Sequence, residues 1–147
     1  MTSIAELMTH DHRSCDHDFA RAETLVNKKD WEGATEAFEA FAEGVEAHFR
    51  AEEEELFPRF EAATGMTQGP TRVMRMEHAQ IRQLQDQLIE AARAGKADAF
   101  QSVAETLLIM MEQHNMKEEN ILYPMAYNTA GASADELGAR IAARREA

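Results

Sequence analysis

Apolar residues recur every three or four positions along most of the chain, which is the period of an α-helix. The first series covers residues 4–27 and follows a capping-box pattern that begins at Ser3. After a polar break, Asp30 stands where an N-cap is expected, and a second helix is predicted to end near Ala63. Pro58 predicts a bend within this second helix.

The second half of the chain shows the same pattern after a loop. Residues 65–70 hold two glycines and a proline, and proline is tolerated in the first turn of a helix. A third apolar series runs from this loop to a break at residues 95–96, and a fourth begins near Asp98. The pattern therefore predicts four helices joined by short connections.

Four such helices predict an all-α fold, an antiparallel up-down-up-down four-helix bundle. We expect this bundle to occupy residues 1–128 as one domain. Residues 129–147 are predicted to be a tail, with a loop over residues 129–133 and a short helix. The helix is predicted from the capping-box pattern between Ser133 and Glu136 and from the shared face of Leu137 and Ile141.

Composition excludes several classes of function. The 147 residues include 15 Lys and Arg against 27 Asp and Glu, so the formal charge is −12, which disfavours nucleic acids and anionic membranes as partners. No apolar run approaches the ~20 residues that span a bilayer, and the first residues lack the features of a secretion signal, so we expect a cytoplasmic location. Because Cys15 is the only cysteine, a metal site must use nitrogen and oxygen ligands.

One segment occurs twice, 66 residues apart: HFRAEEEELFP at residues 48–58 and HNMKEENILYP at residues 114–124. Both fit HxxxEExxL[FY]P, and the same offset relates His12 to His78. A histidine and a glutamate four residues apart leave one helix face about one turn apart and can reach the same ion. A single HxxxE motif is weak evidence in a glutamate-rich chain. Its repetition indicates a duplicated helical hairpin in which both halves carry ligands.

Four of the six histidines belong to the apolar faces of their predicted helices, namely His12, His48, His78 and His114. Residues on antiparallel neighbours lie at the same height when they are equally distant from the connecting turn. The midpoints between successive members are positions 30, 63 and 96, close to the three predicted breaks. The four histidines are therefore predicted to share one layer, whereas His10 and His17 are predicted at the surface, with His17 as a reserve ligand.

Glu52 and Glu118, the glutamates of the two HxxxE motifs, face the same layer. Burying two carboxylates without cations costs several kcal/mol, and the apolar face has no repeated Lys or Arg that would neutralise them. A pair of bound cations is therefore favoured over a purely structural polar layer. Two histidines per ion with bridging carboxylates suit iron, with manganese or zinc as alternatives.

Three further residues near the layer have open roles. Glu53 and Glu119 lie about 100° further round their helices and are interpreted as a solvated face or as groups that orient the ligands, with direct ligation as the alternative. Tyr123 occupies the repeat position of Phe57, and its hydroxyl is placed to hydrogen-bond to an oxygen on the metal.

With these residues the chain resembles the hemerythrin-like family of HHE cation-binding proteins over about residues 4–128. The resemblance rests on Asp11-His12, the doubled HxxxEExxL[FY]P motif and Glu77-His78. It implies a four-helix bundle that holds two iron ions bridged by carboxylates and by an oxo or hydroxo group. Carried over residue by residue, it implies the ligands His12, His48, Glu52, His78, His114 and Glu118.

The chain departs from the oxygen-carrying hemerythrins that it resembles. Those proteins place two histidines four residues apart on the third helix, where Met74 and Arg82 flank His78 here, and they use HxxxxD where this chain has HxxxE. The symmetrical ligand set is more like that of di-iron proteins linked to nitric oxide stress and iron–sulfur cluster repair. The resemblance therefore implies a protein that binds or senses oxygen, nitric oxide or peroxide. The alternatives are an iron-binding regulatory, storage or iron–sulfur-repair module without reversible oxygen carriage, and a metal-free interaction bundle.

Overall fold

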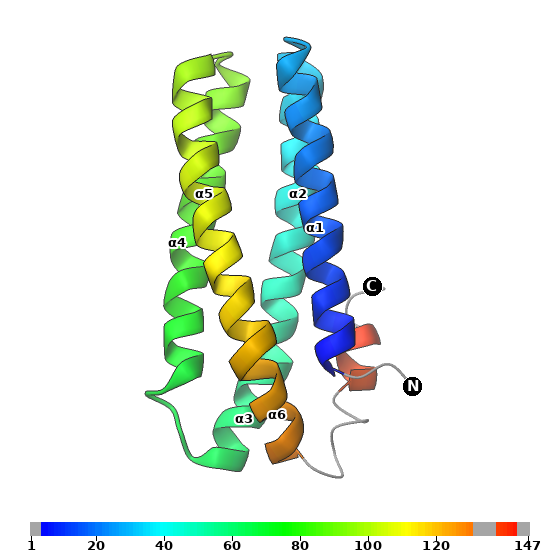
Figure 1. Ribbon diagram of the computed structural model, residues 1–147, viewed down its shortest axis with the longest axis vertical. Coiled ribbons are helices and arrows are strands. Elements are labelled where there is room, and N and C mark those ends of the chain that lie inside the picture. The colour runs from blue at the N-terminus through cyan, green and yellow to red at the C-terminus, as the bar shows by residue number, and fades with distance from the viewer. Residues whose placement is uncertain (1–3, 131–137, 144–147) are drawn as a thin grey trace.

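The computed structural model describes residues 4–130 and 138–143, and the regular structure in these ranges is entirely helical. Four long rods run alternately up and down beside one another (Figure 1). In chain order the rods are α1 (Ile4–Asn27), α2–η1–α3 (Trp31–Ala51, Glu52–Leu56, Phe57–Thr64), α4 (Pro70–Arg93) and α5–η2–α6 (Ala97–Lys117, Glu118–Leu122, Tyr123–Ala130), where η marks a π-helical segment. The predicted all-α antiparallel bundle is confirmed.

The breaks between the rods lie where the sequence predicts them. Asp30 caps α2, because its side chain accepts a hydrogen bond from the Gly33 amide at 3.0 Å. Gly65 ends α3 and Gly95 follows α4, and both adopt left-handed backbone with φ of 73° and 66°. Glycine takes this conformation without the steric penalty that a Cβ atom brings. These short connections make consecutive rods antiparallel neighbours.

The tail departs from its prediction at the start. Residues 129 and 130 continue α6, so the expected loop does not begin at residue 129. The capping-box residues Ser133 and Glu136 and the apolar Leu137 lie outside the described residues. Residues 138–143 are helical and lie beside the lower part of the bundle (Figure 1). Ile141 is buried in one hydrophobic cluster with Ile4 and Met8 of α1.

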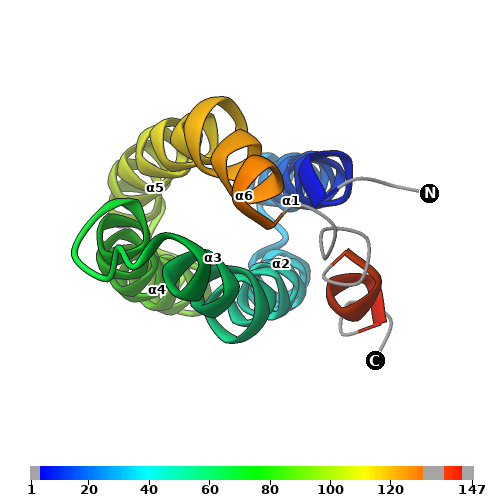
Figure 2. The ribbon, with the colours of Figure 1, turned by 90° about the horizontal axis from the view of Figure 1, so that it is seen from below.

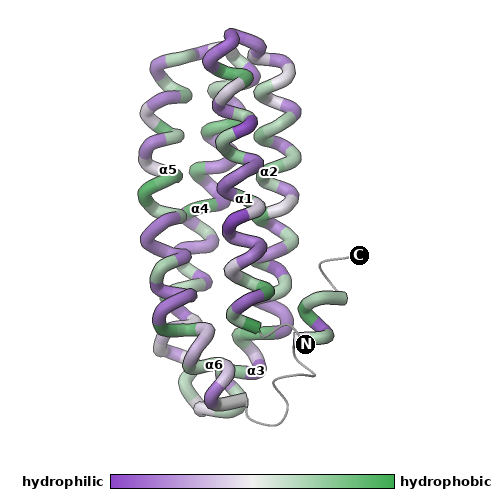
Figure 3. The backbone as a smooth tube through the Cα atoms, turned by 45° about the vertical axis from the view of Figure 1, so that its right-hand side comes forward, coloured by the Kyte–Doolittle hydropathy of each residue, from purple (hydrophilic) through white to green (hydrophobic). Residues whose placement is uncertain are grey.

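Two hydrophobic clusters fill the bundle, one toward each end. The upper cluster includes Phe19, whose ring packs edge-on against Phe38 and Phe41 at centroid distances of 5.3 Å. The lower cluster includes Met8 and Met74, an equivalent pair in the repeat, and α3 and α6 contact each other beside it (Figure 2). Hydrophilic and hydrophobic residues alternate along each rod (Figure 3), as helical amphipathicity requires.

No helix among the described residues is long and apolar enough to cross a membrane.

Candidate metal centre

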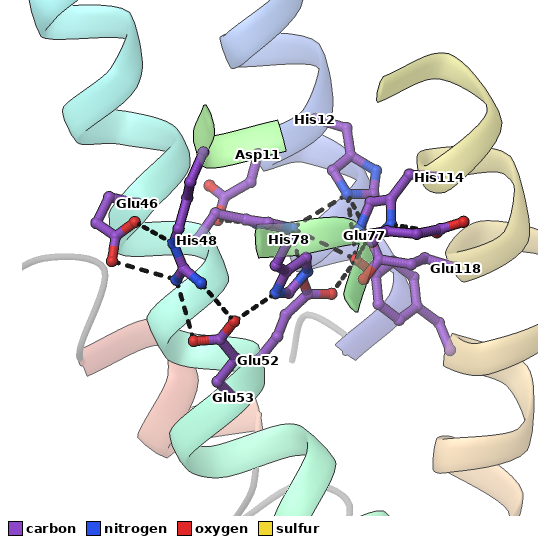
Figure 4. Close-up of polar contacts among 12 residues, drawn as sticks. Asp11, His12, Glu46, His48, Glu52, Glu53, Glu77, His78, His114 and Glu118 are labelled. Carbon is purple, nitrogen blue, oxygen red and sulfur yellow. Dashed lines mark hydrogen bonds and ion pairs between the residues drawn. The ribbon is translucent and has the colours of Figure 1, made fainter. Parts of the chain in front are cut away.

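Six buried side chains form a polar layer between the two hydrophobic clusters (Figure 4). The four histidines come one from each rod, and the two glutamates each begin a π-helical segment. The layer consists of His12, His48, Glu52, His78, His114 and Glu118. Each of them is at most 4% exposed. The structure thus brings together all six residues that the resemblance implies as ligands, whereas His10 and His17 are exposed on α1.

Donor atoms of the layer fall into two groups that share one carboxylate. Glu52, His78, His114 and Glu118 form the first group, and His12, His48 and Glu118 form the second. Within each group the potential ligand atoms lie within 4.8 Å of one another. Glu118 belongs to both groups, because its Oε1 atom lies 3.1 Å from His12 Nε2 and 3.3 Å from His114 Nε2. A carboxylate in this position can bridge two ions.

Each imidazole turns its other nitrogen to a carboxylate on a neighbouring rod. The Nδ1 atoms of His12 and His78 lie 2.7 Å from Glu119 and Glu53 respectively. The Nδ1 atoms of the other two histidines face Asp11 and Glu77: the His48–Asp11 distance is 3.1 Å and the His114–Glu77 distance is 2.8 Å. We call these four acids the outer carboxylates: Asp11, Glu53, Glu77 and Glu119.

The outer carboxylates form a closed circuit around the layer. Asp11 on α1 contacts the histidine of α2, and Glu53 on η1 contacts the histidine of α4. Glu77 on α4 contacts the histidine of α5, and Glu119 on η2 contacts the histidine of α1. Each acid is a direct sequence neighbour of a layer residue on its own rod. The structure thus places Glu53 and Glu119 against imidazoles rather than in the layer. Asp11 and Glu77 have the same function, which the sequence analysis missed although the 66-residue offset relates them.

This circuit decides which imidazole nitrogen can bind a metal. A carboxylate only accepts hydrogen bonds, so each Nδ1 donates its proton to an acid, and each Nε2 is the nitrogen left for a cation. The Nε2 atoms point at one another and at carboxylate oxygens: His12 Nε2 lies 3.1 Å from His48 Nε2, and His78 Nε2 lies 3.1 Å from Glu52 Oε1. Acceptor atoms that face one another in a buried space repel unless a proton or a metal cation lies between them. These imidazole and carboxylate atoms therefore fit a metal site as its ligands.

Unsatisfied atoms support the same conclusion. Among the described residues, the buried side-chain atoms without a hydrogen-bond partner include one from each of four layer members: Glu52 Oε1, His78 Nε2, His114 Nε2 and Glu118 Oε2. Buried polar atoms in folded proteins are rarely left without a partner. Their concentration at one place indicates a ligand that completes them.

Burial and charge set the protonation of the site. Burial lowers the pKa of His48 to about 4, against the opposing effect of Asp11, so this imidazole is neutral at pH 7, as metal ligation requires. Burial and the charge of Glu118 raise the pKa of Glu52 well above its usual value. Partial burial opposes the ionisation of Glu53, but hydrogen bonds from His78 and Arg82 outweigh it and hold its pKa at about 2.

Tyr123 lies at the edge of the layer and is fully buried. Its hydroxyl is 2.8 Å from Glu52 Oε2 and 3.0 Å from Glu118 Oε1, so it can donate to either carboxylate. The equivalent Phe57 ring has no such group and stacks on His78 at a centroid distance of 5.6 Å. The hydroxyl thus contacts the two carboxylates, while a hydrogen bond from it to an oxygen on the metal stays a prediction.

The two π-helical segments are the local feature that the sequence analysis did not predict. The amide of Phe57 donates to the carbonyl of Glu52, and that of Tyr123 donates to Glu118, five residues back instead of four. A proline ring clashes with the carbonyl four residues before it in an α-helix, and the wide turns lie where Pro58 and its repeat equivalent would produce that clash. The π turns replace the simple bend expected at Pro58, and such turns are frequent at functional sites.

The comparisons with known proteins agree with this geometry. A family model described as the hemerythrin HHE cation-binding domain matches residues 3–126. Searches of the curated proteins and of the solved structures found no match. The matched residues include the whole polar layer, and its buried histidine and glutamate cluster fits a metal site. The chain belongs to the hemerythrin HHE cation-binding family.

Proposed function

We propose that this protein binds two iron ions in the polar layer and uses them to bind or sense a small diatomic or peroxide ligand. The observation that carries the proposal is the sharing of Glu118 between the two groups of donor atoms. A mononuclear site needs only one such group. Two groups with a common carboxylate favour a dinuclear centre.

The donor chemistry supports iron. Imidazole nitrogen and carboxylate oxygen together suit non-haem iron, whereas the described site holds no thiolate of the kind that selects zinc or copper(I). Bound iron would supply redox activity and Lewis acidity at this position. Manganese and zinc remain the alternatives that metal analysis distinguishes.

The protein's own part is to hold the ligands, neutralise charge and exclude water. Glu52 and Glu118 supply negative charge next to the cations, and the outer carboxylates fix the four imidazoles. Phe49 stacks on His78 at a centroid distance of 3.8 Å and shields it from solvent. The second group offers only three protein residues, which leaves coordination positions for a small ligand.

Metal analysis of protein purified without added metal tests the centre. We expect about two irons per chain, and loss of the bridged pair in Glu118→Ala, because both groups lose their common carboxylate. Glu105→Ala is the matched control, since this exposed glutamate on α5 of the same rod lies outside the layer. A Glu118→Ala protein that keeps its full iron content and its charge-transfer absorption contradicts the assignment.

Absorption after mixing the reduced protein with oxygen, nitric oxide or peroxide tests the ligand. We expect new bands with at least one of the three. Iron without any response to them indicates the alternative, an iron-binding regulatory, storage or iron–sulfur-repair module. A chain without metal indicates an interaction bundle.

A further inference from the structure

The two halves of the duplicated centre are covered differently. In the half formed by α2, η1 and α4, Arg82 spans the interface: it donates to Glu46 at 2.8 Å and to Glu53 at 3.0 Å. Its guanidinium lies 5.2 Å above the ring of Phe49, which itself lies flat on His78. An ion-paired cation on an aromatic ring thus covers this half, and His78 behind it is fully buried.

The other half lacks both parts of this cover. The 66-residue offset places Asp16 where the closed half has Arg82, and Asn115 where it has Phe49. The carboxylates are retained, because Glu112 and Glu119 correspond to the two glutamates that the arginine binds. A cation has thus been replaced by an acid, and a large ring by a small amide.

The consequence is a groove between α1 and α5 that reaches the layer. It has a volume of about 460 Å³, and Asp16, Glu112, Asn115 and Glu119 line it. His12 also lines it, although this imidazole is only 4% exposed. The backbones of α1 and α5 also pack less closely than those of α2 and α4. The groove therefore runs from solvent to an imidazole of the metal-binding layer.

Charge indicates what the groove admits. Asp16 is exposed, and the negative charges of Glu119 and Glu112 act on it, so three carboxylates share one passage. Among the lining residues, Arg13 is the one arginine and none is a lysine. Grooves lined by one sign of charge concentrate ions of the opposite sign and raise their association rate by about 10 to 10³-fold.

At its inner end the groove meets side chains that can bind a cation. Glu119 is partly exposed and contacts His12 Nδ1 at 2.7 Å, so it joins the groove to the layer. Behind it lies the second donor group, His12, His48 and Glu118, and Glu118 Oε2 is buried without a hydrogen-bond partner. This orphaned oxygen is independent of the acidic lining and indicates a bound cation.

We propose that divalent metal ions enter the centre through the groove between α1 and α5, and that Arg82 closes the equivalent path between α2 and α4. The inference rests on the proposed metal-binding function. The duplication supplies two chemically similar sets of ligands, and the two substitutions, arginine to aspartate and phenylalanine to asparagine, leave only one set accessible. Metal then fills the centre from the His12 side.

The rate of metal uptake tests this route. Metal-free protein is mixed anaerobically with excess Fe²⁺ or Co²⁺ under pseudo-first-order conditions, and binding is followed by absorption and by final metal content. Asp16→Arg installs the residue of the closed half, next to the two glutamates that it can bridge. We expect uptake to slow by about tenfold or more with an unchanged final metal content, because the ligands themselves are intact. Glu112→Gln, which adds no bulk, is expected to slow uptake by a smaller factor.

Asp86→Arg is the matched control. It makes the same change of charge on α4, eight residues or about 12 Å along the helix from His78, and away from the groove. Equal uptake rates in Asp16→Arg and Asp86→Arg overturn the route while leaving the centre in place. A wild-type chain that takes up no metal overturns the proposed function and the route together.

Discussion

At the scale of single residues, the outer carboxylates determine which nitrogen of each layer histidine is available to the metal that we propose. A free imidazole exchanges its proton between two nitrogens, and only the neutral tautomer with a bare Nε2 suits the geometry of the layer. The outer carboxylates remove that freedom by accepting a hydrogen bond from every Nδ1. They also make each imidazole a stronger base toward the metal.

Glu77→Gln tests this function at one histidine. Glutamine keeps the size of the side chain but weakens the hydrogen bond that His114 Nδ1 donates at 2.8 Å. We expect metal affinity to fall by about 10 to 100-fold, the usual effect of losing such a partner. Competition with a chelator of known affinity measures the change.

Lys117→Gln controls for the other contact of the same carboxylate. Lys117 pairs with Glu77 from the solvent side, with 47% of its side chain exposed. Exposed ion pairs of this kind contribute little, so affinity should change by less than about twofold. Equal losses in Glu77→Gln and Lys117→Gln would mean that the surface pair, and not the imidazole contact, supports the metal.

Tyr123→Phe restores the symmetry of the repeat and tests the hydroxyl. The buried Glu52 and Glu118 lose a donor at 2.8–3.0 Å, which should lower the unfolding free energy of the metal-free protein by about 1–3 kcal/mol. In the loaded protein the cations satisfy the same oxygens, so the loss should be smaller. Urea unfolding of both forms checks the difference, and an equal loss in both would contradict it.

At the scale of elements, the helices could be predicted and their irregularities could not. The 3.6-residue period places the rods, and Asp30, Gly65 and Gly95 mark their ends because caps and left-handed turns have strong residue preferences. The buried positions across each π segment are still four residues apart, as from Glu52 to Leu56 and on to Phe60, so the period does not reveal the wider turn. Pro58 is the available signal, and by itself it predicts only a bend.

Asp30→Ala tests the capping of α2 separately from the site. The substitution removes the side-chain acceptor for the Gly33 amide and should lower the unfolding free energy by about 1 kcal/mol. Metal content should not change, because Asp30 is 18 residues from both His12 and His48, about 27 Å along the helices. Chemical unfolding and metal analysis check the two parts, with Glu36→Ala, an exposed change on the same helix, as the neutral control. Loss of metal in Asp30→Ala would show that the turn and the layer are coupled.

At the scale of the whole molecule, the layer could be predicted from the sequence while its surroundings could not. Counting residues to the turns suffices to align His12, His48, His78 and His114, because antiparallel rods fix relative heights. The partners of Asp11 or Glu77, and the difference between the two covers, depend on which side chains meet across neighbouring rods. No pattern within a single helix contains that information.

The position of the layer between two hydrophobic clusters also links metal to stability. Any ion that binds the folded chain alone stabilises it, by about 4 kcal/mol at a free concentration a thousandfold above Kd. We therefore expect chelation to lower the unfolding free energy and the midpoint temperature, measured by urea and thermal unfolding with and without metal.

Glu52→Gln should separate the effect of the layer on the stability of the metal-free fold from its effect on metal binding, because the substitution acts on the two forms in different directions. In the metal-free chain, burial and the charge of Glu118 disfavour the Glu52 carboxylate. The uncharged amide therefore keeps or raises the stability of that form. In the loaded chain the same change removes a ligand and a negative charge, so the stabilisation by metal should shrink. A Glu52→Gln protein that is less stable than wild type without metal, and equally stabilised by metal, would show that this carboxylate acts in the fold instead of at the ions.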